Sequence, residues 1–179
     1  SLHWDQHTDR INIHPSVILA PGASLKVFHP EATKGVCLEI GEGSHIYSSF
    51  NILKPGAKII IGKNCQLGQV QFISADSIEV QDDVLMAWGI TILDSDTHSL
   101  YWEERKNDVR DSRADYLMTG GYDIGRSHDW SKIKTRKVII EGKCWIGVNT
   151  IILKGVTIGE GCIIRAGSVV TQDIEPWHI

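Results

Sequence analysis

The sequence predicts an all-β protein built as a parallel β-helix, and two features of its 179 residues support this fold class. One aliphatic residue recurs at every sixth position of a long segment, at Ile140, Ile146, Ile152, Ile158, Ile164 and Val170. Glycines and small or β-branched residues punctuate the same intervals. This period matches neither an amphipathic helix nor a simple hairpin sheet. It fits short strands joined by tight turns, three of which close a coil of about 18 residues that stacks on the next coil at about 4.8 Å.

The same spacing recurs upstream in shorter runs, so the coil is expected to extend over most of the chain. The runs are Ile13, Leu19 and Leu25; Ile40, Ile46 and Ile52; Ile61, Leu67 and Ile73; and Val80, Met86 and Ile92. The six-residue spacing is interrupted between one run and the next. Each interruption indicates extra residues at a corner of the coil, which a solenoid accommodates on its outside. Because an isolated coil cannot bury its aliphatic residues, we expect one stacked domain over residues 1–179, with about seven coils and a height of about 30–35 Å. An ordinary β-sandwich is disfavoured because its strands recur about every 8–12 residues.

The pattern stops before His98 and resumes beyond residue 136. Ile92 and Ile140 lie 48 residues apart, which is a multiple of six, so the coil resumes in phase. The stretch from 98 to 136 is therefore predicted to be one long loop inserted into the coil, not a boundary between domains.

Composition excludes several classes of function. The net charge of −4 gives no electrostatic signature of nucleic-acid or membrane binding. No apolar run approaches transmembrane length, and the first residues do not resemble a signal peptide. The four cysteines have no metal-ligand spacing, so we expect reduced thiols in a cytoplasmic protein.

The segment VIIEGKCWIGVNTIILKGVTIGEGCIIRAGSVVTQDI, residues 138–174, resembles the terminal coils of the hexapeptide-repeat acyltransferases. That family includes the maltose and galactoside O-acetyltransferases and many polysaccharide acetyltransferases. The resemblance implies a left-handed β-helix, which the period alone does not determine, and assembly as a homotrimer. It also implies transfer of an acetyl group from acetyl-CoA to a hydroxyl or an amine. Members of the family usually continue past the position that matches Ile179, so a C-terminal extension is expected to be absent.

His98 is the candidate catalytic residue. Members of the family carry a histidine in a Thr-His context where the chain leaves the coil for a loop, and Thr97-His98 precedes Trp145-Ile146-Gly147 at a matching distance. A neutral imidazole can remove the proton of a sugar hydroxyl as it attacks a thioester, with no acyl-enzyme required. The group that orients this imidazole is left open between the carboxylates of Asp94, Asp96, Glu103 and Glu104 and a backbone carbonyl.

Residues near His98 are candidates for binding the acceptor. Aromatic rings can stack on sugar rings and carboxylates can bind hydroxyls, although the same rings can also fix the loop to the prism or to a neighbouring subunit. The substrate-binding candidates are Trp88, Asp94, Asp96, Tyr101 and Trp102. His128, in the loop, is a further residue that could contact the substrate.

The resemblance also suggests where coenzyme A binds, along the last coils in a groove between adjacent prisms. The candidate positions are Gly147, Val148, Lys154, Ala166, Thr171 and Gln172. Small residues there would let the pantetheine arm approach the backbone, but tight β-helix corners require small residues as well. Lys154 could bind a phosphate, although solvated corner lysines are common.

These observations favour an acetyl-CoA-dependent O-acetyltransferase that acts on a sugar or polysaccharide. Two alternatives remain open, an N-acetyltransferase of an amino sugar and a non-catalytic β-helix that acts in binding or scaffolding. A γ-type carbonic anhydrase on the same scaffold needs three converging histidines, and the sequence places no histidine pair near His98. We therefore expect no metal.

Overall fold

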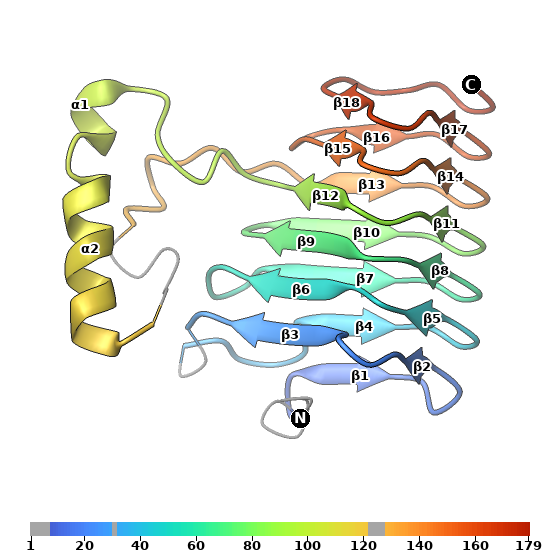
Figure 1. The fold of residues 1–179 in the computed structure, drawn as a ribbon, viewed down its shortest axis with the longest axis horizontal. Helices are drawn as coiled ribbons and strands as arrows, with labels where there is room; N and C mark the ends of the chain where they lie inside the picture. Colours follow the sequence, from blue (N-terminus) through green and yellow to red (C-terminus); the bar gives the residue numbers. More distant parts are fainter. Residues whose placement is uncertain (1–7, 30–31, 122–127) are drawn as a thin grey trace.

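The protein is a left-handed β-helix with three parallel sheets, drawn in Figure 1 as a stack of coils from the N-terminus at the bottom to the C-terminus at the top. The structure is a computed structural model, and it describes residues 8–29, 32–121 and 128–179. Each sheet contains six strands, and each coil contributes one strand to every sheet. The predicted fold class is therefore confirmed.

The strands are short, and those of each sheet lie in parallel register. Sheet A contains β1 (Ile11–Ile13), β4 (Leu38–Ile40), β7 (Lys58–Ile61), β10 (Ser77–Val80), β13 (Val138–Ile140) and β16 (Thr157–Ile158). Sheet B contains β2 (Ile18–Leu19), β5 (His45–Ile46), β8 (Gln66–Leu67), β11 (Leu85–Met86), β14 (Trp145–Ile146) and β17 (Ile163–Ile164). Sheet C contains β3 (Ser24–Val27), β6 (Ser49–Ile52), β9 (Val70–Ser74), β12 (Ile90–Leu93), β15 (Ile151–Ile152) and β18 (Val169–Val170).

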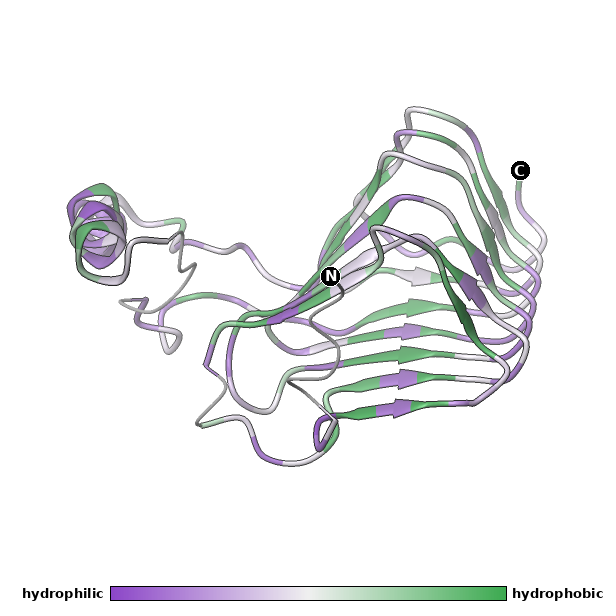
Figure 2. Ribbon diagram, turned by 60° about the horizontal axis from the view of Figure 1, so that its bottom comes forward, coloured by the Kyte–Doolittle hydropathy of each residue, from purple (hydrophilic) through white to green (hydrophobic). Residues whose placement is uncertain are grey.

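The six-residue series forms the core. Ile140, Ile146 and Ile152 occupy one coil and stack directly on Ile158, Ile164 and Val170 of the next. These side chains are buried, whereas the residue before each of them on its strand faces outward or is only partly covered. Figure 2 shows the resulting alternation of hydrophobic and hydrophilic positions along the coils. Burial of a large aliphatic side chain contributes about 1.5–3 kcal/mol, so stacking is the main source of stability.

Two details differ from the prediction. The described chain contains six complete coils where about seven were expected, and a seventh begins at the parallel bridge between Ile158 and Ile174. Ile73 was placed in the inward series, but Phe72 fills that position and stacks on Phe50 with ring centroids 5.1 Å apart. Ile73 instead faces a small outer cluster that includes Leu53 and Trp130. Alternation along the five-residue strand β9 explains the difference, because inward positions fall on Val70, Phe72 and Ser74.

The insertion leaves the prism after β12 and returns before β13 (Figure 1). It contains two helices that the sequence analysis did not predict, α1 (Trp102–Arg105) and α2 (Asp108–Thr119). In Figure 1, α2 stands apart from the prism, and of its described residues only Asp115 is buried. A helix without an apolar stripe gives no periodic signal, which is why it was missed.

Candidate active site

The base of the insertion is anchored by Asp94, which directly follows β12. Its side chain is 0% exposed, and its carboxylate accepts hydrogen bonds from Ser74 Oγ at 2.7 Å, the Ala75 backbone N–H at 2.6 Å and the Asp76 backbone N–H at 2.9 Å. Burial raises the pKa of this carboxyl, and the three donors oppose the shift. We had expected Asp94 to bind substrate. A buried carboxylate with both oxygens engaged instead fixes the corner from which the insertion departs.

The two ends of the insertion pair with each other to form a neck. Ser95 and Thr135 form an antiparallel bridge, and the Asp96 backbone N–H donates to the Lys134 carbonyl at 3.0 Å. Asp96 Oδ1 lies 2.6 Å from Lys154 Nζ. We had expected Lys154 to lie near a coenzyme phosphate and Asp96 to bind substrate. The two side chains are instead paired with each other, and the pair connects the next coil to this neck.

His98 follows a strained residue at the end of the neck. Thr97 has a φ of +58°, which is rare for a β-branched residue and indicates a backbone held in place by its surroundings. The His98 backbone N–H donates to the Asp96 carbonyl at 2.7 Å, and the imidazole is 49% exposed. The neck thus holds the backbone of His98 firmly and presents its ring to solvent.

Among the residues that the structure describes, the hydrogen-bonding partner of the imidazole is Asp108, the first residue of α2. His98 Nδ1 lies 2.6 Å from Asp108 Oδ2. An ionised carboxylate can only accept a hydrogen bond, so Nδ1 carries the proton and Nε2 of the neutral ring keeps its lone pair. A carboxylate in the first turn of a helix is also favoured by the helix dipole. In this arrangement His98 Nε2 can act as a base, and the negative charge of Asp108 beside Nδ1 can stabilise the protonated ring.

Asp108 was not among the residues that we expected to orient His98. Glu104 bonds to the Ser99 hydroxyl, and Glu103 bonds to Lys106 Nζ at 2.8 Å, so these two candidates are engaged elsewhere in the loop. The chain turns back through α1 and brings Asp108 to the ring, ten residues after His98. The only available signal was an acidic residue at a helix start, and the helix itself had no periodic signature.

His128 lies on the returning part of the insertion, beside His98. The ring centroids of these histidines are 4.9 Å apart, and those of His128 and Trp130 are 5.9 Å apart. Burial lowers the pKa of His128, and the neighbouring His98 adds to this effect, while Asp108, Asp115 and Asp111 oppose it. The insertion therefore folds so that two imidazoles and one carboxylate converge.

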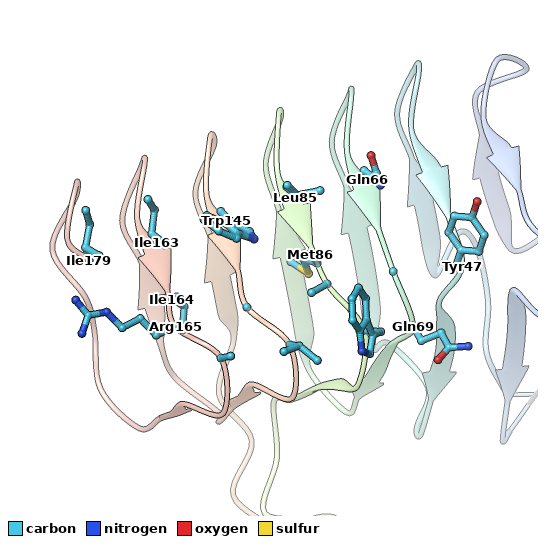
Figure 3. Close-up of a pocket in the computed structure, with 16 residues that line it drawn as sticks. Tyr47, Gln66, Gln69, Leu85, Met86, Trp145, Ile163, Ile164, Arg165 and Ile179 are labelled. Atoms are coloured by element: carbon cyan, nitrogen blue, oxygen red, sulfur yellow. The ribbon is translucent and has the colours of Figure 1, made fainter.

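An apolar groove of about 1010 Å³ runs along the outer face of sheet B and the corner between sheets B and C. Figure 3 shows its side chains on successive coils, with Tyr47, Gln66, Leu85, Trp145, Ile163 and Ile179 in a row. Three of the expected coenzyme residues, Gly147, Val148 and Ala166, line this groove. Gly147 is required by coil stacking in any case, because a Cβ there would lie 2.5 Å from the backbone nitrogen of Ala166.

The remaining predicted residues are spread over the groove, the last coil and the insertion. Trp88, 63% exposed, lines the groove and not the surroundings of His98. Thr171 and Gln172 line a second, smaller cavity at the last coil. Tyr101 and Trp102 are exposed on the insertion, and the Arg105 guanidinium lies 5.8 Å from the centre of the Trp102 ring. On one prism, His98 and the groove therefore belong to different corners.

Residues 137–172 match the family model described as bacterial transferase hexapeptide (six repeats). The last coils of the chain are therefore similar to this family of transferases. The chain is 29% identical over 122 residues to the galactoside O-acetyltransferase of Escherichia coli (strain K12), a match that covers 68% of the chain and 48% of that relative. The chain thus spans about half the length of this curated relative.

Solved structures with the same fold include AntD, an N-acyltransferase from Bacillus cereus in complex with dTDP and coenzyme A. Its TM-score is 0.65 at 18% identity, over 99% of this chain and 82% of that one. The polySia-specific acetyltransferase NeuO has a TM-score of 0.65 at 20% identity, over 93% of this chain and 64% of that one. At these identities the likeness concerns the fold. Within the described ranges of the chain, the helices are all too short or too polar to cross a membrane.

Proposed function

We propose that the protein transfers an acetyl group from acetyl-CoA to a hydroxyl of a saccharide, with His98 as the general base. The observation that carries this proposal is the 2.6 Å contact between His98 Nδ1 and Asp108 Oδ2, which leaves Nε2 as an exposed base. The galactoside O-acetyltransferase among the relatives supports the choice of acceptor.

Bound acetyl-CoA would supply the acetyl group as a thioester. His98 Nε2 accepts the proton of the acceptor hydroxyl while the hydroxyl oxygen forms a bond to the thioester carbonyl carbon. Asp108 stabilises the imidazolium that results. When the carbon–sulfur bond breaks, His98 returns its proton to the departing sulfur and is again neutral. No side chain of the protein needs to carry the acetyl group.

The groove on sheet B fits a long, partly apolar arm such as pantetheine. Its walls are mainly apolar, and the small side chains of Val148 and Ala166 allow close approach to the backbone. Exposed Arg165 at the same place is suited to a phosphate group. We retain Val148, Ala166, Thr171 and Gln172 as the proposed coenzyme-binding positions, and leave out Lys154 because it is paired with Asp96.

We further propose that the protein works as a homotrimer. Trp145, Leu85 and Trp88 leave large apolar surfaces exposed along one face, and such a patch favours association. On one prism, His98 lies at the corner between sheets C and A, whereas the groove lies along sheet B. A closed ring of three copies could place His98 of one copy beside the groove of the next and repeat the site three times.

The test is to incubate the protein with acetyl-CoA and a panel of sugars, and to measure the release of free thiol. We expect release with one or more hydroxyl acceptors, and loss by about 10²–10⁴-fold in His98→Ala. His14→Gln is a matched control, because His14 lies on the first coils and bonds to the Ser16 hydroxyl. Acetylation restricted to amino sugars would identify an N-acetyltransferase. Full activity in His98→Ala would overturn the assignment of the base, and saccharide binding without any transfer would indicate a binding protein.

A further inference from the structure

Three potential metal ligands meet at the mouth of the insertion, although they come from separate segments. One donor atom each of His98, Asp108 and His128 lies within 4.8 Å of the others. His98 ends the neck, Asp108 begins α2, and His128 lies on the returning segment. Because 30 residues separate the two histidines, this cluster could not be recognised from the sequence.

The composition of the cluster favours a particular class of ion. Two imidazoles and one carboxylate form the donor set of many sites for zinc and neighbouring transition metals, which keep an open coordination position. Magnesium and calcium prefer sites made of oxygen atoms. The half-exposed His98 ring leaves an approach from solvent.

The surroundings of His128 also favour the binding of a cation. Its Nε2 atom is buried and has no hydrogen-bond partner among the described residues, which is unusual for a polar atom removed from water. Asp111 and Asp115 of α2 act electrostatically on the same ring together with Asp108, so these three carboxylates contribute a negative potential at the cluster. Such a potential attracts a cation, and the segment that carries His128 places its ring against His98.

We propose that His98, Asp108 and His128 together bind one divalent transition-metal ion of the zinc class. With metal–nitrogen bonds of about 2.0–2.1 Å, tetrahedral ligands lie about 3.3 Å apart. His98 Nδ1 and Asp108 Oδ2, which are 2.6 Å apart, must therefore separate slightly, and the His128 donor, within 4.8 Å of the others, must come to a similar distance from both. Rotation of the exposed His98 ring and the Asp108 side chain can provide much of this movement. Coordination through Nδ1 displaces the proton that this atom shares with Asp108, and Nε2 takes up a proton from solvent, so the ring changes tautomer and stays neutral.

One consequence rests on the proposed function. A neutral His98 ring that coordinates through Nδ1 carries its remaining proton on Nε2, so it cannot accept another from the substrate. A bound ion would therefore inhibit transfer reversibly.

The experiment titrates Co²⁺ into the tag-free, metal-free protein and follows the visible absorption of the bound ion. We expect about one strong site, with the affinity reduced at least tenfold in His128→Gln and in Asp108→Asn. His14→Gln, which removes a histidine outside the cluster, should bind like the unchanged protein. Circular dichroism establishes that each variant is folded. No Co²⁺ absorption, or equal affinity in His128→Gln, would overturn the site.

A second arm measures thiol release with and without Zn²⁺, and after EDTA, within each variant. Zn²⁺ should inhibit the unchanged protein, EDTA should reverse the effect, and His128→Gln should need at least tenfold more Zn²⁺. Co²⁺ binding in a protein without any transfer would leave the metal site standing and refute only the proposed function. If Co²⁺ binds but Zn²⁺ does not change the rate of acetyl transfer, the proposal that the bound ion inhibits transfer is refuted.

Discussion

His98 Nδ1 and Asp108 Oδ2 lie 2.6 Å apart, although the α1 turn separates the two residues along the chain. The contact joins the rigid neck, which fixes the His98 backbone, to α2, which carries the carboxylate. The orientation of the imidazole therefore depends on the insertion as well as on the coil.

Asp108→Asn tests this dependence. An amide can donate to Nδ1, which would favour the tautomer with its proton on Nε2 and remove the base. We expect kcat to fall by about 10–100-fold, less than the 10²–10⁴-fold expected for loss of the base, with KM nearly unchanged. Nitrogen NMR of the His98 ring should show the change of tautomer. Asp108→Glu should restore part of kcat, and an unchanged tautomer in Asp108→Asn would contradict the assignment.

Trp145→Asp tests the proposed assembly. Trp145 is 50% exposed on β14, in the middle of the apolar face of sheet B. A buried carboxylate without a partner is strongly unfavourable, so the variant should sediment as a monomer where the unchanged protein sediments as a trimer. Transfer activity should fall with the trimer. Ile60→Asp, on the outer face of sheet A, is the control and should leave the assembly intact. A monomeric unchanged protein would refute the shared site.

Asp94→Asn tests the anchor of the insertion. In the variant, the amide oxygen can still accept a hydrogen bond, but the amide nitrogen replaces the second carboxylate oxygen and cannot accept one. The donors that bond to this second oxygen in the unchanged protein would therefore lose their acceptor. Leaving buried donors unsatisfied costs about 1–3 kcal/mol, and the free energy of unfolding in urea should fall by that amount. Glu103→Gln, an exposed change on α1, should alter it by less than about 0.5 kcal/mol. Equal stability of the two variants would mean that the corner does not depend on Asp94.

The buried thiols predict a loss of stability at alkaline pH. Burial raises the pKa of Cys65 and of Cys144 from 9.0 to about 11. The folded protein therefore retains these protons above pH 9, while the unfolded chain releases them, so the free energy of unfolding should decrease between pH 9 and 11. Replacing both cysteines with alanine should reduce this slope. Ellman's reagent at pH 8 should modify these thiols quickly only after denaturation; rapid reaction in the native protein would contradict their burial.

The order of residues predicted the scaffold, because each coil must bury one aliphatic residue per face and that requirement repeats every six positions. It located the insertion, since Ile140 resumes the period begun before it, and it placed His98 at the departure point. Even there, alternation within the longer strand β9 put Phe72 inward where Ile73 had been expected.

The tertiary structure alone decided what surrounds His98. No period governs the insertion, so nothing in the order of residues brings Asp108 or His128 to the ring, ties Lys154 to Asp96, or buries Asp94 among donors of the preceding coil. These contacts depend on how the chain turns back on itself through two helices without an apolar stripe. Packing imposes a regular pattern on a sequence only where the same packing environment repeats. The candidate site lies in the insertion, where that repetition stops.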